Sequence, residues 1–380
     1  MAQKSTIKEI ARLAGVSIGT VDRAIHDRPE VSPDTKRRID AIIQSLDYAP
    51  NIMARQLALN KPLAFRAVMP HHGQDSGYWA LCRDGIQRAA RDLAVYGVSI
   101  RIDEFDRHDA ESYQKLLADL AADPGDGFAI APVAPSILVP ALKRLSRKVP
   151  YVFFDGSIEG AEPLCSVGQD AFSGGFLAAR ILDMASPDAG PLIAVVTHRE
   201  DRHIRLRMEG FAAYCRGDAS PAARRASLDR SPAGTPRRTA IVRECYDLED
   251  PSIRGAFFER LFEEHPHASG ILVTNASGHH AGKWLAERCL KEKHAVVCWD
   301  LVPSNVEALI AGEVDCILSQ KPADQARYAM DRLFKAIVRN DRSGAEELVM
   351  PLEIYFRENL PAARPSDNPR SEEYDEREFA

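Results

Sequence analysis

The sequence predicts an α/β protein in which a small all-helical unit precedes two lobes, each built on a doubly wound parallel sheet. Three amphipathic helical patterns follow one another within the first 50 residues. From residue 63 onward, short apolar runs alternate with amphipathic helical windows, the pattern of parallel strands joined by right-handed crossovers. Roughly ten such strands exceed the usual size of one sheet, so we expect two lobes facing each other across a cleft.

The composition is that of a globular protein with more than one domain. Of the 380 residues, 45% are hydrophobic and 27% are charged, and no run of about 18 uncharged apolar residues occurs. The seven cysteines form no CxxC pair and mostly lie in apolar surroundings, so we expect buried, reduced thiols. No signal-peptide pattern begins the sequence, and we therefore expect a cytoplasmic protein without a membrane segment.

Charge is divided unevenly along the chain. Residues 1–62 contain ten Lys and Arg against seven Asp and Glu, whereas the remaining residues contain 39 against 48. A small basic head therefore precedes an acidic body.

The first predicted helix begins at Thr6, which with Glu9 matches a capping box. Its apolar residues recur with helical spacing, and Gly15 ends it because a tight turn favours a residue without a Cβ. These apolar positions are Ile7, Ile10, Ala11 and Ala14.

The second predicted helix begins at Ser17, a favourable N-cap, and turns Val21, Ala24 and Ile25 inward. Its outward face and exposed start carry polar or small residues, namely Ser17, Ile18, Gly19, Thr20, Asp22, Arg23 and His26.

A third helix is predicted from Ser32-Pro33-Asp34 onward, where a cap, a proline and an acid suit a first turn. It buries Ile39, Ile42, Ile43 and Leu46. Three short helices with a four-residue turn between the first two indicate a helix-turn-helix unit. A generic three-helix module with a solvated face is the alternative.

A resemblance favours DNA binding. The stretch TIKEIARLAGVSIGTVDRAIHDRPEVSPDTKRRIDAIIQSLDYAPNIMARQLA resembles the headpiece of the lac-repressor (LacI/GalR) family. The resemblance implies that the second helix enters the major groove, with Ile18, Gly19 and Asp22 selecting the operator sequence. The carboxylate of Asp22 can accept a hydrogen bond from cytosine but repels phosphate, so it narrows the range of DNA sequences that the helix recognises. The residues expected to contact DNA are Thr6, Ser17, Ile18, Gly19, Thr20, Asp22, Arg23, His26, Asn51, Arg55 and Leu57.

Residues 51–62 form a predicted hinge and linker. Pro50 disfavours helix in the residue before it, Asn51 can cap a helix, and the helical pattern from Ile52 to Leu59 is only about eight residues long. We expect this segment to order only on DNA, in a dimer. The resemblance implies that paired hinge helices enter the minor groove and insert Leu57 between base steps. An inert linker is the alternative.

The body places polar and aromatic residues after successive apolar runs. Ligands of open α/β sheets lie at the carboxyl ends of the strands, and this mixture suits a polyhydroxylated molecule. A helix-cap or turn role is the alternative for each residue taken singly. The positions are His71, His72, Gln74, Asp75, Tyr78, Trp79, Asp155, His198, His203, Arg207, Thr274, Asn275, Cys298, Trp299, Asp300, Ser319 and Gln320.

The body also resembles the type I periplasmic-binding-protein fold that serves as the effector domain of the LacI/GalR family. Its motifs here include Arg205-Leu206-Arg207-Met208-Glu209-Gly210-Phe211, in which the resemblance gives Arg207 the role of clamping ligand hydroxyls or a carboxylate. Two departures concern the ribose-type pattern, because Ala134 replaces an acid and Gly156 replaces a frequent Arg. The expected ligand-binding residues are His71, Tyr78, Trp79, Asp155, His203, Arg207, Asn275, Trp299, Asp300 and Gln320.

The predicted domains follow from these patterns. The headpiece spans residues 1–50, the hinge 51–62 and the effector domain 63–357, with a disordered tail at 358–380. Within the effector domain we expect a first lobe at about 63–164 and 321–350, and a second at about 165–320 and 351–357.

Two other function classes were weighed against a DNA-binding regulator. An enzyme is disfavoured because no GxGxxG follows the first strand and no P-loop or G-x-S-x-G elbow occurs. His71-His72, His279-His280 and His265-Pro266-His267 lack the helical spacing of zincin ligands, so we expect no metal, cofactor or catalytic residue. A secreted solute-binding protein is disfavoured by the headpiece. The prediction is a repressor-type regulator, a homodimer or higher oligomer, that binds operator DNA under control of a sugar-like ligand.

Overall fold

The computed structural model describes residues 7–25, 31–46, 62–145, 149–221, 236–339 and 346–361. The chain divides into two compact units, residues 1–61 and 62–380. The predicted hinge at residues 51–59 lies outside the described residues, and so does most of the predicted tail. None of the described helices is long and apolar enough to cross a membrane.

The described residues of the first unit form three short helices, as the apolar periodicity predicts: α1 (Ile7–Ala14), α2 (Ile18–Ile25) and α3 (Pro33–Ser45). Ser17 accepts a hydrogen bond from the amide of Thr20 at 3.1 Å, and Ser32 accepts one from Thr35 at 3.3 Å. Both serines therefore cap helix starts, where backbone N–H groups lack partners. A small core holds the helices together, formed by Ile10, Ala11, Ala14, Val21, Ala24 and Ile39.

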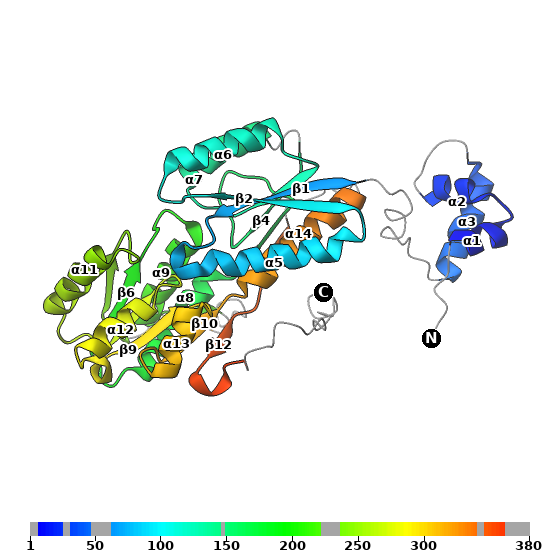
Figure 1. The fold of residues 1–380 in the computed structure, drawn as a ribbon. Helices are drawn as coiled ribbons and strands as arrows, with labels where there is room; N and C mark the ends of the chain where they lie inside the picture. The colour runs from blue at the N-terminus through cyan, green and yellow to red at the C-terminus, as the bar shows by residue number, and fades with distance from the viewer. Residues whose placement is uncertain are drawn as a thin grey trace. The chain divides into compact units, whose positions relative to one another are not determined.

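The second unit consists of two α/β lobes (Figure 1). The first lobe has a six-stranded, all-parallel sheet in the order β11-β5-β4-β3-β1-β2. Helices α5 and α14 pack against each other on one face, and α6 and α7 on the other. Its elements are β1 (Leu63–Pro70), the 3-10 helix η1 (Asp75–Gly77), α5 (Tyr78–Ala94), β2 (Val98–Phe105), α6 (Ala110–Ala122), β3 (Gly127–Ile130), α7 (Pro135–Leu145), β4 (Tyr151–Phe154), β5 (Cys165–Gly168), α14 (Pro322–Arg339) and β11 (Glu346–Val349).

The second lobe repeats this plan with the order β12-β10-β9-β8-β6-β7. Its edge strand β12 is antiparallel to β10, while the other pairs are parallel. Its elements are α8 (Ala171–Ala185), β6 (Leu192–Val196), α9 (Arg202–Cys215), β7 (Ala240–Glu244), α11 (Pro251–Glu264), β8 (Gly270–Val273), α12 (His279–Glu287), the 3-10 helix η2 (Lys291–Lys293), β9 (Ala295–Trp299), α13 (Pro303–Ala311), β10 (Cys316–Ser319), β12 (Glu353–Tyr355) and the 3-10 helix η3 (Arg357–Asn359).

Alternating residues of β6 show why the apolar runs in this lobe are continuous. Ile193 and Val195 belong to the core on one face of the sheet, whereas Leu192 and Ala194 belong to the core on the other. Helices cover both faces, so a strand of such a sheet has no solvent side and needs no polar alternation.

The chain passes between the lobes three times, after β5, after β10 and after β11. The expected boundary at residues 164 and 165 therefore lies one strand too early, because β5 pairs with β4 in the first sheet. The apolar character of Cys165–Gly168 gave no indication of which sheet it would join. Of the seven cysteines, six are buried and Cys289 is exposed, and none forms a disulfide.

Candidate functional site

A cavity lies where the carboxyl ends of strands from both sheets meet. The atom-free space around it is about 350 Å³ when the open solvent is counted. Parallel strands of both lobes deliver their loops to this place, as expected for open α/β sheets. The lining residues are Asp75, Tyr78, Trp79, Arg107, Asp155, His198, Asp201, His203, Ile204, Arg207, Asn275, Ala276, Asp300 and Gln320.

An ionic cluster joins the two lobes at one wall of the cavity. Arg107, which follows β2, donates to Asp75 at 2.6 Å within its own lobe and to Asp201 of the second lobe at 2.5 Å. His198 of the second lobe lies 3.1 Å from the second carboxylate oxygen of Asp75. Trp79 donates its indole N–H to Asp75 at 2.7 Å. The cluster therefore links the β1–α5 loop to the segment between β6 and α9.

Burial and charge act against each other in this cluster. Burial raises the pKa of Asp75, but Arg107 and His198 outweigh it, and the pKa of Asp75 falls below its usual range. Burial lowers the pKa of Arg107, but its two carboxylate partners raise it further above the ordinary value. For Asp201 burial prevails, and its pKa is raised. Breaking this cluster would leave a buried charge without a partner.

Arg207 is a second buried cation in the cavity. Its guanidinium carbon lies 3.7 Å from the centre of the Trp299 ring. It donates to the Thr274 carbonyl at 2.7 Å and to the side-chain oxygen of Gln320 at 3.0 Å. Its side chain forms no ion pair within the described part of the chain, although Asp300 and Asp155 act on it electrostatically. A fully charged group held by neutral partners is suited to bind polar atoms of a ligand.

Two glycines fix the helix that carries Arg207. A Cβ at Gly210 would overlap the carbonyl oxygen of Phe172, and a Cβ at Gly175 would overlap that of Arg207 itself. Helices α8 and α9 therefore pack backbone to backbone. The spacing from Arg207 to Gly210 in the sequence thus combines a side chain that lines the cavity with the contact that positions it.

Two carboxyl groups lie beside Tyr78 and Gln320, next to Arg207. The hydroxyl of Tyr78 donates to Asp155 at 2.5 Å, and the side-chain amide of Gln320 donates to Asp300 at 2.9 Å and to Tyr78 at 3.0 Å. Burial raises the pKa of Asp155 to about 7 and that of Asp300 to about 6. Both groups can accept or donate hydrogen bonds near neutral pH.

Several of these residues have left-handed backbone conformations. The φ angles are +52° at Asp75, +72° at Asp155, +50° at His198 and +64° at Asp300. Non-glycine residues pay a conformational cost there, and such strain gathers at binding sites. Asp155, His198 and Asp300 come within two residues of a strand end, whereas Asp75 begins the 3-10 helix η1, and all four side chains line the cavity.

Eight of the ten expected ligand-binding residues line the cavity, namely Tyr78, Trp79, Asp155, His203, Arg207, Asn275, Asp300 and Gln320. Trp299 lies beneath Arg207. Asn275 also accepts the amide of Ser277 at 3.1 Å, so it has the turn role that was its alternative. The structure places His71 elsewhere. It is 55% exposed and faces Glu104 because the chain turns away from the cavity after β1 and returns only at Asp75.

Sequence reasoning missed Arg107 and Asp201, and it did not select Asp75 or His198 among the polar residues that follow strands. Arg107 comes two residues after β2, so a stricter search of every strand end would have found it. Asp201 precedes α9 at its N-cap position and has the pattern of an ordinary cap. Only the structure shows that its carboxylate meets Arg107 from the other lobe.

The outer face of α2 in the first unit has the expected small and polar character. Ser17, Ile18 and Gly19 are exposed, with Ile18 at 45%. Thr20, Asp22 and Arg23 are half-buried. The remaining expected DNA contacts, Thr6, His26, Asn51, Arg55 and Leu57, lie outside the described residues.

Two family models match the chain. Residues 66–340 match the model of the periplasmic binding protein domain. Residues 6–51 match the model of bacterial regulatory proteins of the lacI family. The two matches coincide with the two units and confirm the predicted fold class.

Among curated proteins, the catabolite control protein A of Streptococcus mutans is 27% identical over 54% of this chain and 59% of its own length. The transcriptional regulator GalR of Salmonella typhimurium is 48% identical over 54 residues, which are 14% of this chain and 16% of GalR. The chain thus spans little more than half of the first relative and a sixth of the second.

Solved structures share the fold of the second unit. A putative LacI transcriptional regulator from Bacteroides fragilis superposes with a TM-score of 0.65 at 22% identity, covering 79% of this chain and 98% of that one. The glucose-galactose binding protein GanP of Geobacillus stearothermophilus gives 0.64 at 18% identity, covering 80% and 100%.

Proposed function

The chain belongs to the periplasmic binding protein domain family over residues 66–340 and carries a LacI-family segment at residues 6–51, and from this premise we propose that it is a sequence-specific DNA-binding transcriptional regulator. In this proposal it acts as a repressor in the cytoplasm. A small ligand, namely a sugar, a polyol or a sugar derivative, binds between the lobes and controls its affinity for operator DNA.

The exposed face of α2 supports the DNA-binding part. Its N-terminal end presents Ser17, Ile18 and Gly19 to solvent, while Val21 and Ala24 hold the helix to the core. A helix exposed at this end can enter a major groove with its first residues against base edges. The match of residues 6–51 to the lacI family supports the interpretation of this exposed helix end as a DNA-binding surface.

The arrangement of Arg207 over Trp299 carries the ligand-binding part. The guanidinium, held over Trp299, lines the cavity together with Asn275, Gln320 and the two carboxyl groups of Asp155 and Asp300, and the aromatic side chains in the lining are those of Tyr78 and Trp79. Ring-shaped polyols have hydroxyls at their rim and C–H groups on their faces, which these groups complement.

The charge of the lining favours a neutral ligand. Four acids, Asp75, Asp155, Asp201 and Asp300, face two cations, Arg107 and Arg207. The raised pKa values of Asp155 and Asp300 reduce the excess of negative charge near pH 7 but do not reverse it. A phosphorylated sugar would bring two further negative charges into this wall, at a high electrostatic cost.

Coupling to DNA follows from the position of the cavity between two lobes. A ligand that contacts both lobes favours the closed arrangement over an open one by its differential binding energy. Strand β1 of the first lobe begins directly after the segment that joins the two units. In a homodimer, a shift of the lobes that carry the two DNA-binding units would change their spacing and hence their fit to the operator.

A thermal-shift screen tests the ligand class. Neutral sugars, polyols and sugar acids are added to the full-length protein and to its Arg207→Ala variant. A compound that binds only the folded state raises the melting temperature by mass action, and at 100 times its Kd adds about 2.7 kcal/mol of stability. We expect a neutral polyhydroxylated compound to stabilise the wild type and not the variant. Equal stabilisation of both proteins would contradict the assignment of the cavity.

A further inference from the structure

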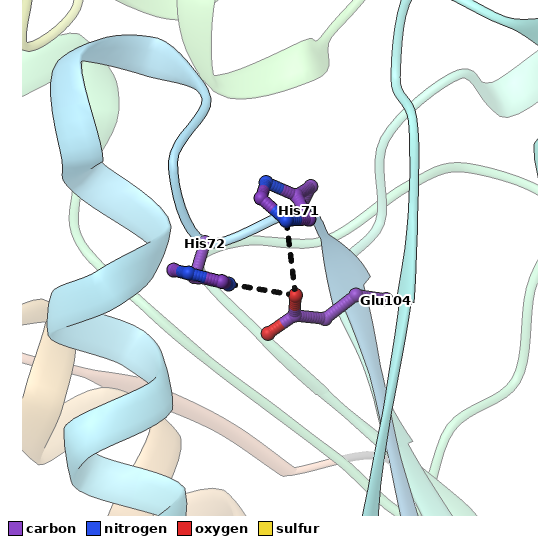
Figure 2. A group of neighbouring side chains, drawn as sticks. All are labelled: His71, His72 and Glu104. Atoms are coloured by element: carbon purple, nitrogen blue, oxygen red, sulfur yellow. Dashed lines mark hydrogen bonds and ion pairs between the residues drawn. The ribbon is translucent and has the colours of Figure 1, made fainter.

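Two histidines and a glutamate come together outside the ligand cavity. His71 and His72 follow β1, and Glu104 lies near the end of β2, the neighbouring strand. The Nδ1 atom of His72 is 2.8 Å from Oε2 of Glu104, and Nε2 of His71 is 3.8 Å from the same oxygen. Figure 2 shows both rings turned toward this carboxylate. Each of the three residues offers one possible ligand atom, a ring nitrogen or a carboxylate oxygen, and these three atoms all lie within 4.8 Å of one another.

These distances suit a cation with tetrahedral coordination. Ligand atoms at 2.0–2.2 Å from a zinc ion stand about 3.3 Å apart in a tetrahedron. The two distances above bracket that value, so small side-chain rotations, above all of the exposed His71, would complete the geometry. The second oxygen of Glu104, Oε1, is buried and forms no hydrogen bond with the described residues. A guanidinium nitrogen of Arg83 lies 3.7 Å from it, so this oxygen has an ion-pair partner but no hydrogen-bond donor among the described residues.

We propose that His71, His72 and Glu104 form a binding site for a zinc-class divalent cation, with three protein ligands and one open position. Two imidazoles and one carboxylate favour zinc and related transition metals over magnesium or calcium, which prefer oxygen ligands alone. The site lies apart from the sugar-type cavity and does not depend on the proposed regulator function.

Arg83 of α5 opposes the cation. Its guanidinium nitrogen is 3.1 Å from Nδ1 of His72 and 3.7 Å from Oε1 of Glu104. The side chain is 39% exposed, so it can turn into solvent when a metal ion takes its place. Arg83 therefore competes with the metal for the same two groups. Its removal should strengthen metal binding, which an adventitious surface site would not show.

Metal binding would also act on the loop that leads to the ligand cavity. The Nδ1 atom of His71 accepts the amide hydrogen of Gly73 at 3.2 Å, so in the neutral ring Nε2 carries the proton. Coordination through Nε2 transfers that proton to Nδ1, and the amide of Gly73 must then release its acceptor. The loop continues through Asp75, which binds Arg107 in the cavity wall. The cation is thus placed to alter the loop that holds one wall of the cavity.

Calorimetric titration tests the site directly. The full-length protein is freed of metal with a chelator and titrated with zinc chloride in the presence of excess magnesium. His72→Gln and Glu104→Gln remove ligands, and Arg83→Gln removes the competitor. His267→Gln is the matched control, because His267 is an exposed histidine outside the cluster. Hydrogen exchange of residues 71–78 is recorded with and without zinc.

We expect one zinc equivalent on the wild type and on the His267→Gln variant. The affinity should fall at least about tenfold in His72→Gln and Glu104→Gln, and it should rise in Arg83→Gln. Zinc should change exchange at residues 71–78 in the wild type but not in Glu104→Gln. Equal zinc affinity in all five proteins would overturn the proposal, as would displacement of zinc by magnesium.

Discussion

The guanidinium of Arg207 lies over the indole ring of Trp299, with 3.7 Å between its central carbon and the ring centroid. Trp299 ends strand β9, and Arg207 lies on α9 at a point where α8 and α9 touch through their backbones. The buried indole ring supports the guanidinium, and Arg207 is the member of the pair that lines the cavity.

Replacing Arg207 tests the role of its planar group. Arg207→Lys keeps a positive charge but removes the fork that donates to Thr274 and Gln320. We expect ligand affinity to fall about 10- to 100-fold in Arg207→Lys and further in Arg207→Ala, since hydrogen bonds to charged groups contribute about 1.5–3 kcal/mol each. Calorimetry with a ligand found in the thermal-shift screen gives these values. DNA affinity without ligand should stay within about twofold of the wild type, and a wild-type ligand response in either variant would exclude this role.

Gly210 tests the contact that positions Arg207. In Gly210→Ala the new Cβ meets the backbone of Phe172 and Phe176, which cannot move aside as a flexible side chain could. We expect a loss of about 1–3 kcal/mol in the free energy of unfolding. The matched control is Gly255→Ala in α11, where no atom lies within 4 Å of the new Cβ. At this position the better helix propensity of alanine should raise the free energy of unfolding by as much as about 1 kcal/mol. Urea denaturation measures both, and equal effects would show that the glycine contact is unimportant.

The raised pKa of Asp155 predicts a pH-dependent stability difference. A carboxyl whose folded pKa is about 7 stabilises the folded state fully at pH values below its ordinary pKa of 3.8 and loses that contribution as the pH rises through 7. Asparagine does not titrate. The stability of Asp155→Asn relative to the unliganded wild type should therefore increase between pH 5 and pH 8, by at most about 3 kcal/mol. Urea unfolding at both pH values checks this, and a constant difference would contradict the buried, protonated state.

Asp22 tests the DNA-binding face of α2. Selection of operator sequences from random DNA should give a changed base preference for Asp22→Asn, with about 1–3 kcal/mol of altered discrimination at one position in each half-site. Asp34→Asn removes the same charge from the first turn of α3, away from the exposed face of α2. Both variants should gain nonspecific affinity through lower repulsion of phosphate. An unchanged preference in Asp22→Asn would remove this residue from the set of specificity determinants.

Some elements of the structure could be predicted from the sequence, and others could not. Helix starts such as Ser17 and Ser32 and the inward faces of the short helices were predicted because caps and apolar spacing act locally. The residues at strand ends were also predicted, since parallel strands deliver their loops to one edge. The pairing of β5 with the first sheet was not predictable, because a short buried strand has the same sequence pattern whichever of the two sheets it joins.

The contacts between lobes could not be predicted from the sequence either. Arg107 and Asp201 are 94 residues apart and meet only when both lobes have folded. His71 was predicted in the cavity because it directly follows β1, yet the backbone turns at once and brings Asp75 there instead. Such turns depend on left-handed conformations, which at Asp75 and Ser76 occur without a glycine to indicate them.

The central claim is that a ligand between the lobes changes the affinity for DNA, and fluorescence anisotropy of a labelled operator measures this directly. The operator comes from the selection and the ligand from the thermal-shift screen. At saturating ligand we predict that the Kd for operator DNA changes by a factor of about five or more, as is typical of coupled sites. The same concentration of ligand should leave the Kd of Arg207→Ala unchanged. The same Kd with and without ligand in the wild type, under conditions where the melting temperature proves that the ligand is bound, would contradict the account.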